Sequence, residues 1–237
     1  MYIIIIQARM GSTRLPGKVL KKLLDKEIVL WSYDRCKKSK ANEVIIATSI
    51  EKNNDILEEL FIKNNIKYFR GSENDLLDRY YQIANKYQYT NNINIIRVTS
   101  DCPFVDPNII NNMIDYYENN NYDYIINHSK NGIIPEGSGI EIINFKSLKY
   151  LWENEHDEKF REHATGMLTQ CDKYTHILNI GYYNYLPKNI DIIKFYKIKI
   201  SIDTQEEYEK SQKISQYFNN YDFSYDDLLL FYDSLFK

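Results

Sequence analysis

The chain has little of what marks secreted, membrane-spanning or cysteine-bound metalloproteins. Its 237 residues include three cysteines, Cys36, Cys102 and Cys171, which are far apart and odd in number. They fit neither a disulfide framework nor a CxxC metal site. The apolar run Tyr2–Ile6 is too short for a signal peptide or a membrane helix. We therefore expect a cytoplasmic protein with no membrane partner.

The chain also has no excess of positive charge. Lys and Arg total 30 and Asp and Glu total 33, which gives a formal net charge of −3. A protein that coats nucleic acid needs a basic field, so no nucleic-acid partner is expected, although a local basic pocket remains compatible with this balance. Hydrophobic residues make up 43% and charged residues 27%. These values are typical of a soluble globular protein with a proper core.

The pattern of the first half of the chain predicts the fold class. Short, apolar, β-branched runs typical of buried strands occupy residues 2–6, 43–49, 66–70 and 94–99. Segments with helical periodicity occupy residues 28–38, 55–64 and 75–87. Asp106 and Pro107 begin a further helix, with the aspartate as its cap. This alternation predicts an α/β protein, a Rossmann-like three-layer sandwich around a mostly parallel sheet.

The second half is less regular. Strands are expected at residues 122–127, 139–143 and 196–202, and helices at 159–170, 204–218 and 225–236. No linker, repeat or low-complexity block interrupts the chain. We therefore expect a single domain over residues 1–237.

The loop after the first expected strand is the most informative segment. It reads IQARMGSTRLPGKVL, with the cations Arg9, Arg14 and Lys18 and, between them, the small residues Gly11, Ser12 and Thr13. Small residues let backbone N–H groups approach an anion, which the cations neutralise. Ligands of α/β sheets bind beyond the carboxyl ends of strands, so this loop predicts a polyphosphate site. The alternative is a solvated loop with scattered charges. The Walker pattern does not match, because Val19 follows Lys18.

Two aspartates are expected at the same edge of the sheet. Asp101 follows the strand at 94–99, and Asp203 ends the strand at 196–202. A nucleoside triphosphate needs Mg²⁺, which is held by one or two carboxylates with phosphate oxygens and water. Asp101 and Asp203 are therefore the candidate metal ligands. The alternative is that each aspartate only caps the turn or helix that follows it.

Other polar residues are candidates for substrate binding. Arg70, Ser72 and Arg79 could frame the base or ribose of a nucleotide, and Arg161 and His163 could contribute to an acceptor site. An exposed charged helix is the alternative for the last two. His156 and His163 lack a third ligand at suitable spacing, so zinc is not expected. Further substrate-binding candidates are Ala8 and Glu141.

Five blocks resemble one known family in the expected order. They are IIQARMGSTRLPGKVL at 5–20, RGSENDLLDRY at 70–80, RVTSDCPFVDP at 97–107, REHAT at 161–165 and IDT at 202–204. They resemble the cytidylyltransferases grouped with spore-coat polysaccharide biosynthesis proteins, relatives of CMP-Kdo and CMP-sialic acid synthetases. Two departures are Ser100, where the family has glycine, and a loose match at 135–139 to the family's PDGLD segment.

The resemblance implies a Mg²⁺-dependent enzyme that transfers CMP from CTP to a hydroxyl of a sugar acid or related acceptor and releases pyrophosphate, for surface polysaccharide or glycoconjugate synthesis. Asp101 and Asp203 match the family's metal-binding aspartates. Arg9, Arg14 and Lys18 would hold the β- and γ-phosphates and stabilise departing pyrophosphate. The family also implies a homodimer, with residues 122–143 as a contact arm.

Two other functions stay open from the residues. A nucleotide-sugar-dependent glycosyltransferase would share the pocket and the acidic metal site, but Asp101-Cys102-Pro103 is not the usual DxD motif. A non-catalytic nucleotide-binding relative would bind nucleotide without forming pyrophosphate.

Overall fold

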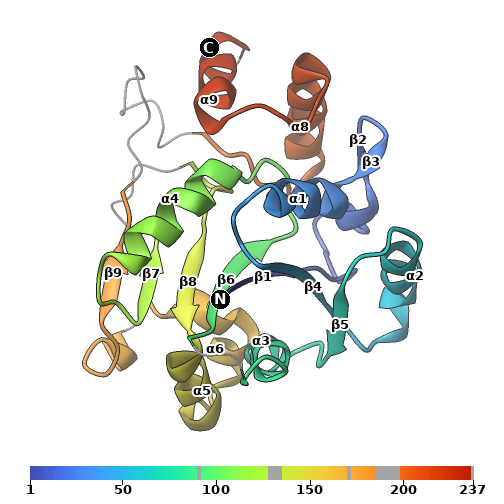
Figure 1. Cartoon of the computed structure of the whole chain (residues 1–237). Coiled ribbons are helices and arrows are strands. Elements are labelled where there is room, and N and C mark those ends of the chain that lie inside the picture. The colour runs from blue at the N-terminus through green and yellow to red at the C-terminus, as the bar shows by residue number, and fades with distance from the viewer. Residues whose placement is uncertain (90–91, 128–134, 170–171, 185–197, 236–237) are drawn as a thin grey trace.

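The computed structural model of the chain describes residues 1–89, 92–127, 135–169, 172–184 and 198–235. In these residues a seven-stranded sheet has the order β5-β4-β1-β6-β8-β7-β9 (Figure 1). The strands are β1 (Tyr2–Gln7), β4 (Glu43–Ser49), β5 (Tyr68–Gly71), β6 (Asn94–Thr99), β7 (Tyr124–Ile126), β8 (Glu141–Asn144) and β9 (Ile180–Tyr182). Only the pairs that β8 makes with β6 and β7 are antiparallel. The predicted mostly parallel α/β sheet is confirmed.

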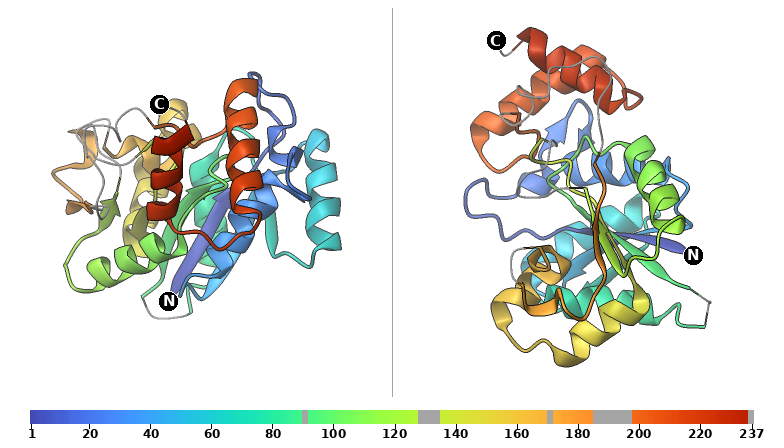
Figure 2. Two further views of the ribbon diagram at one scale, coloured as in Figure 1. Left: turned by 90° about the horizontal axis from the view of Figure 1, so that it is seen from above. Right: turned by 90° about the vertical axis from the view of Figure 1, so that its left-hand side faces the viewer.

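Helices cover both faces of the sheet, as the two views in Figure 2 show. One face packs against α1 (Ile28–Lys37), α2 (Asp55–Lys63), α4 (Pro107–Glu118), α8 (Gln205–Phe218) and α9 (Tyr225–Leu235). The other packs against α3 (Leu76–Asn85), α5 (Phe145–Asn154) and α6 (Glu158–His163). A small hairpin of β2 (Lys22–Leu23) and β3 (Lys26–Glu27) lies beside α8.

The central strand β1 explains why its sequence is apolar at every position. Ile4 and Ile6 belong to the core on the α1 side, and Ile3 and Ile5 to the core on the α3 side. All four side chains are completely buried. A strand covered by helices on both faces cannot alternate polar and apolar residues.

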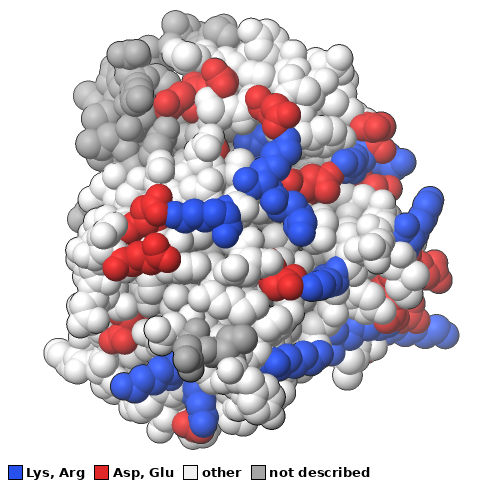
Figure 3. Space-filling model, in the orientation of Figure 1, with Lys and Arg blue, Asp and Glu red and all other residues white. Residues whose placement is uncertain are grey.

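The charged surface agrees with the balanced composition. On the face shown in Figure 3, Lys and Arg side chains are interspersed with Asp and Glu.

Cys36 and Cys102 are buried free thiols, and Cys171 lies outside the described residues. None of the helices in the described part of the chain is long and apolar enough to cross a membrane.

The predicted strand at 196–202 is wrong. Residues 196 and 197 lie outside the described ranges, and residues 198–202 form no strand, because their one bridge, between Lys199 and Glu136, is isolated. The apolar positions of this segment are buried as the alternation suggested. Its hydrogen bonds go to Glu136 on one side and to the Asp101 carbonyl on the other, so no ladder forms.

Gly137 permits this crossing. It has a φ of +104°, and a Cβ atom at this position would lie 2.3 Å from the backbone nitrogen of Ser201. Only glycine fits both the backbone conformation and the close approach.

The helix expected at 159–170 is shorter than predicted. It ends at His163 because the next residue, Ala164, has a φ of +47° and a buried side chain. A 3-10 turn at Ala164–Met167 follows, and Gln170 lies outside the described residues. The segment 122–143, expected to be a contact arm, contributes β7 and the start of β8 to the sheet, and its residues 128–134 also lie outside.

Side chains cap the starts of α4 and α8, and the predicted Asp106 cap is confirmed. Asp106 caps α4 by accepting a hydrogen bond from the Asn108 N–H, and its second oxygen accepts one from the Tyr225 N–H at the start of α9. Thr204 and Glu207 form a capping box at the start of α8.

Arg35 of α1 joins distant parts of the core, and its replacement tests the packing. This buried side chain donates to the carbonyls of Val105, Tyr221 and Phe223 at 2.7–2.9 Å. Arg35→Met leaves these carbonyls without partners and should lower the free energy of unfolding by about 3 kcal/mol. Urea denaturation measures this change. Lys37→Met, an exposed change on the same helix, is the control, and equal stability of the two variants would contradict the assignment.

Candidate active site

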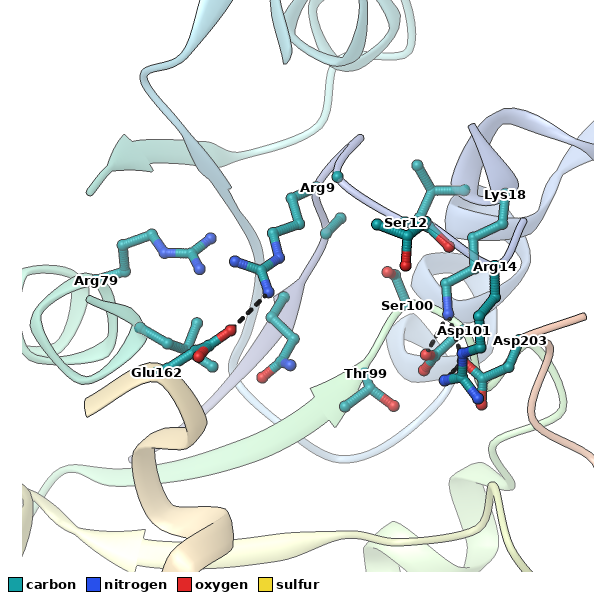
Figure 4. Close-up of a pocket in the computed structure, with 16 residues that line it drawn as sticks. Arg9, Ser12, Arg14, Lys18, Arg79, Thr99, Ser100, Asp101, Glu162 and Asp203 are labelled. Carbon is teal, nitrogen blue, oxygen red and sulfur yellow. Dashed lines mark hydrogen bonds and ion pairs between the residues drawn. The ribbon is translucent and has the colours of Figure 1, made fainter. Parts of the chain in front are cut away.

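A cavity of about 260 Å³ opens at the carboxyl ends of β1 and β6 (Figure 4). The two strands are paired so that Gln7 lies opposite Thr99. The loop after β1 and the turn after β6 therefore begin side by side. Sixteen residues line the cavity: Gln7, Ala8, Arg9, Gly11, Ser12, Thr13, Arg14, Lys18, Val19, Leu76, Arg79, Thr99, Ser100, Asp101, Glu162 and Asp203.

One end of the cavity is built around the Lys18 ammonium. Its Nζ atom lies 2.7 Å from Asp101 Oδ2 and 2.9 Å from Asp203 Oδ1. Arg14 also contacts Asp203 Oδ1, at 2.9 Å. Lys199 contacts the second oxygen of Asp203, at 3.2 Å. The predicted meeting of the cationic loop with the two aspartates is present in the structure.

Local backbone geometry brings Lys18, Asp101 and Asp203 together. Gly17 adopts a left-handed conformation, with a φ of +66°, and the 3-10 turn at Lys18–Leu20 follows it. The Ile202 N–H donates to the Asp101 carbonyl at 2.9 Å, which fixes Asp203 next to Asp101. The Asp203 N–H in turn donates to Glu207 Oε2 of α8, at 2.7 Å.

The electrostatics keep these groups charged. Burial alone would lower the pKa of Lys18, but Asp101 and Asp203 outweigh it, and the pKa is raised. Burial would likewise raise the pKa of Asp203, but its bond to Lys18, with Lys199 and Arg14 nearby, leaves the pKa lowered. The ammonium and the Asp203 carboxylate are therefore both ionised at neutral pH.

Asp101 and Asp203 fit a hard divalent cation. They already share one cation, the Lys18 ammonium, so their oxygens converge on a common point. No group of three or more carboxylate, histidine or cysteine residues suited to a metal is found among the described residues. Two carboxylates completed by phosphate oxygens and water are a donor set that suits Mg²⁺ bound to a nucleotide.

The other end of the cavity has different chemistry. Figure 4 shows Arg79 and Glu162 there, with Arg9 between them and the Lys18 cluster. Arg79 is 2% exposed, and its Nε atom has no hydrogen-bond partner. Its only hydrogen bond found among the described residues is a long one, 3.4 Å from Nη1 to the Ala47 carbonyl. Burial lowers the pKa of Arg79. A buried guanidinium without an acidic partner is costly, so this geometry suits a ligand that accepts its hydrogen bonds.

A second cavity of about 310 Å³ adjoins the first and shares Thr99, Asp101 and Asp203 with it. Its wall includes His163 and the partly buried ion pair of Arg97 with Glu141. Two buried oxygens in this region, Glu141 Oε2 and Ser201 Oγ, lack hydrogen-bond partners in the structure. The two cavities meet at the carboxylate pair.

Most of the candidate residues line one of these cavities. The first receives Ala8, Arg9, Gly11, Ser12, Thr13, Arg14, Lys18, Arg79, Asp101 and Asp203. The second receives Glu141 and His163 together with both aspartates.

Three candidates line neither cavity, and each is held by another partner. Arg70 pairs with Asp55 and Glu58 of α2. Ser72 accepts a hydrogen bond from the Asp75 N–H, at 3.2 Å. Arg161 binds the Asp75 carboxylate at 2.8 Å and also two backbone carbonyls.

Sequence reasoning missed some of the lining residues. Glu162 lies in the first cavity although its two neighbours do not. The only signal for it was its position inside the REHAT block. Gln7, Leu76, Thr99 and Ser100 line the same cavity from strand ends and from the start of α3.

These features define an α/β protein whose cavity has the charges that suit a nucleoside triphosphate with a divalent cation, and comparison gives its family. The chain belongs to the cytidylyltransferase family, whose model matches residues 3–228. It is therefore a nucleotidyltransferase. This assignment favours nucleotidyl transfer over the glycosyltransferase and non-catalytic alternatives.

Known proteins are similar over nearly the whole chain. A cytidylyltransferase structure from Leptospira borgpetersenii is 32% identical, with a TM-score of 0.87, and the match covers 98% of this chain and 94% of that one. The spore coat polysaccharide biosynthesis protein SpsF of Bacillus subtilis is 31% identical, over 90% of this chain and 85% of its own length. A CMP:2-keto-3-deoxy-manno-octonic acid synthetase complexed with CTP shares the fold, with a TM-score of 0.65 at 16% identity over 92% and 99% of the two chains.

Replacing Lys18 tests the charged end of the cavity. Lys18→Met leaves two carboxylates facing each other and should lower the free energy of unfolding by about 2 kcal/mol near pH 7. Because the pKa of Asp203 is lowered in the folded protein, its ion pair with Lys18 stabilises the fold at pH values above the ordinary pKa of aspartate. Lys18→Met removes this stabilisation. The deficit should therefore shrink as the pH falls below about 4, where the carboxylates become protonated.

The matched control is Arg14→Met, and thermal or urea unfolding at several pH values measures both variants. Arg14 contacts the same carboxylate but is 63% exposed, against 12% for Lys18. We expect this variant to lose less than about 0.5 kcal/mol. A Lys18→Met protein as stable as wild type at pH 7 would show that the ammonium does not hold the site together.

Proposed function

We propose that the protein transfers CMP from CTP to a hydroxyl of a sugar acid or related acceptor and releases pyrophosphate, in the cytoplasm and for surface polysaccharide or glycoconjugate synthesis. The observation that carries this proposal is the cationic loop of β1 facing two carboxylates across one cavity. The family assignment and the similarity to proteins described as acting on a keto-deoxy sugar acid and in spore-coat polysaccharide synthesis support it.

The residues at the charged end would position the triphosphate. Arg9, Arg14 and Lys18 bind the β- and γ-phosphates, with backbone N–H groups of the glycine- and serine-containing loop beside them. Lys18 exchanges its aspartate partners for phosphate oxygens. The acceptor oxygen forms a bond to the α-phosphorus, the bond to the β-phosphate breaks, and pyrophosphate and a proton leave. The cations stabilise the charge that collects on the departing pyrophosphate.

Mg²⁺ would be held by Asp101 and Asp203, and when bound it would neutralise triphosphate charge. Both aspartates belong to the two cavities at once. We place CTP in the first cavity and the acceptor in the second, because the acceptor hydroxyl must reach the α-phosphate next to the carboxylates. His163 and the polar wall of the second cavity would bind acceptor hydroxyl groups.

A homodimer is also part of this proposal, and sedimentation analysis measures the oligomeric state.

A pyrophosphate-release screen tests the function. The four nucleoside triphosphates are combined with Mg²⁺ and a panel of acidic sugars, neutral sugars and polyol phosphates. We expect release only when CTP and an acidic sugar or close relative are both present. Release that needs another nucleotide, or transfer from a nucleotide sugar without pyrophosphate, would contradict the proposal.

Removing one carboxylate tests the metal assignment. Asp101→Ala should abolish Mg²⁺-dependent pyrophosphate release, a loss of about 10³-fold or more in rate, because it removes a ligand at the reacting phosphates. Circular dichroism checks that the variant is folded. Full activity in a folded Asp101→Ala protein would exclude Asp101 as a metal ligand.

Kinetics separate the role of Lys18 from that of the acceptor site. Lys18→Ala should raise KM for CTP by about tenfold or more while changing KM for the acceptor little, because CTP is the only one of the two substrates that would contact the lost charge. Steady-state rates with each substrate varied in turn measure the two constants. An unchanged KM for CTP would remove Lys18 from the triphosphate site.

A further inference from the structure

The two ends of the first cavity differ in chemistry, and this difference would orient a bound nucleotide. The Lys18 cluster at one end attracts phosphate. Leu76, Arg79 and Glu162 line the first cavity with it, and Figure 4 shows Arg79 and Glu162 at the opposite end. A nucleoside triphosphate with its phosphates at Lys18 must therefore direct its base toward Arg79 and Glu162. This argument rests on the proposed function.

Arg79 alone cannot recognise the amino group that cytosine carries at C4. Its guanidinium offers only hydrogen-bond donors. Cytosine and uracil both present the O2 acceptor, and they differ at N3 and at C4, where cytosine has an amino group and uracil a carbonyl oxygen. Selection at C4 needs a group that accepts from the amino group and repels the carbonyl oxygen.

Glu162 has the required chemistry and position. An ionised carboxylate is an acceptor only. One oxygen, Oε1, lies 3.3 Å from Arg9 Nη2, and no partner for Oε2 is found among the described residues. Gln7, which also lines the cavity, already uses its side-chain oxygen to accept from Tyr80 and Arg97.

The element that carries Glu162 is anchored. The neighbouring Arg161 ties α6 to the Asp75 carboxylate of the α3 cap at 2.8 Å and to the carbonyls of Trp152 and Glu155. The position of Glu162 is thus fixed relative to α3, the helix that carries Leu76 and Arg79. A side chain on an anchored helix can discriminate between bases more sharply than one on a free loop.

We propose that Glu162 selects cytosine over uracil by accepting a hydrogen bond from the exocyclic amino group at C4, while Arg79 donates to the O2 oxygen that both bases present. A competing explanation is that Glu162 only orients Arg9 for phosphate binding. Glu73 separates the two, because it also holds Arg9, through Oε1 at 3.4 Å and its carbonyl at 3.1 Å, but does not line the cavity.

Calorimetric titration of CTP and UTP with Mg²⁺, without acceptor, tests the proposal on wild type, Glu162→Gln and Glu73→Gln. A glutamine can accept from cytosine or donate to uracil, so Glu162→Gln should reduce the CTP:UTP affinity ratio by about 10- to 100-fold. Glu73→Gln should weaken both nucleotides equally and keep the ratio within about twofold. Thermal melting confirms that the variants are folded.

The outcomes are distinguishable. A wild-type protein that fails to bind CTP contradicts the proposed function itself. A wild-type preference for CTP that persists in Glu162→Gln, or that Glu73→Gln reduces as much, contradicts only the role of Glu162. Glu162→Ala gives an independent check, because it should lose affinity for CTP without gaining affinity for UTP.

Discussion

The ion pairs of Lys18 with Asp101 and Asp203 are the interaction on which the site depends. The three residues come from the loop after β1, the turn after β6 and the segment before α8. Two partly buried carboxylates repel each other, so they lie close together only when a cation is bound between them. The parallel pairing of β1 with β6 and the Ile202–Asp101 backbone bond supply the framework, and the ammonium supplies the charge balance.

The two ends of the first cavity carry different groups. In the proposed function, the charged end would bind features that every nucleoside triphosphate shares, and would therefore contribute affinity without selecting a base. The far end has few groups, but one is a buried guanidinium without an acidic partner among the described residues, and one is a carboxylate with an oxygen to spare. Arg79 is buried, whereas the Glu162 side chain is 48% exposed, so selectivity in the proposed site would come from a hydrogen bond to Glu162 that the wrong base cannot make.

The sequence predicted the first half of the fold well because its strands are buried on both faces and its helices have clear periodicity. It also placed Lys18 and Asp101 together, since the carboxyl ends of parallel strands share one edge. Asp203 joins them for a different reason, the backbone bond from Ile202 to the Asp101 carbonyl. The prediction of a strand at 196–202 failed, because alternating apolar residues indicate which side chains are buried and not which backbone groups are hydrogen-bonded. Strand patterns alone cannot show whether a ladder partner exists.

The choice among neighbouring charged residues was beyond the sequence. Successive helical residues point about 100° apart, so Arg161, Glu162 and His163 face different directions, and nothing in the local sequence says which of them faces the nucleotide cavity. Arg70 and Arg79 were equal candidates by type. Only packing separates them, since Arg70 meets two acids of α2 while Arg79 is a buried residue of α3 that lines the cavity.

A crystal structure of the protein with CTP and Mg²⁺ tests the central claim most directly. The account predicts triphosphate oxygens at Lys18 and Arg14, the metal on Asp101 and Asp203, and the cytosine ring between Leu76, Arg79 and Glu162. A nucleotide bound in the reverse direction, or outside this cavity, would contradict it.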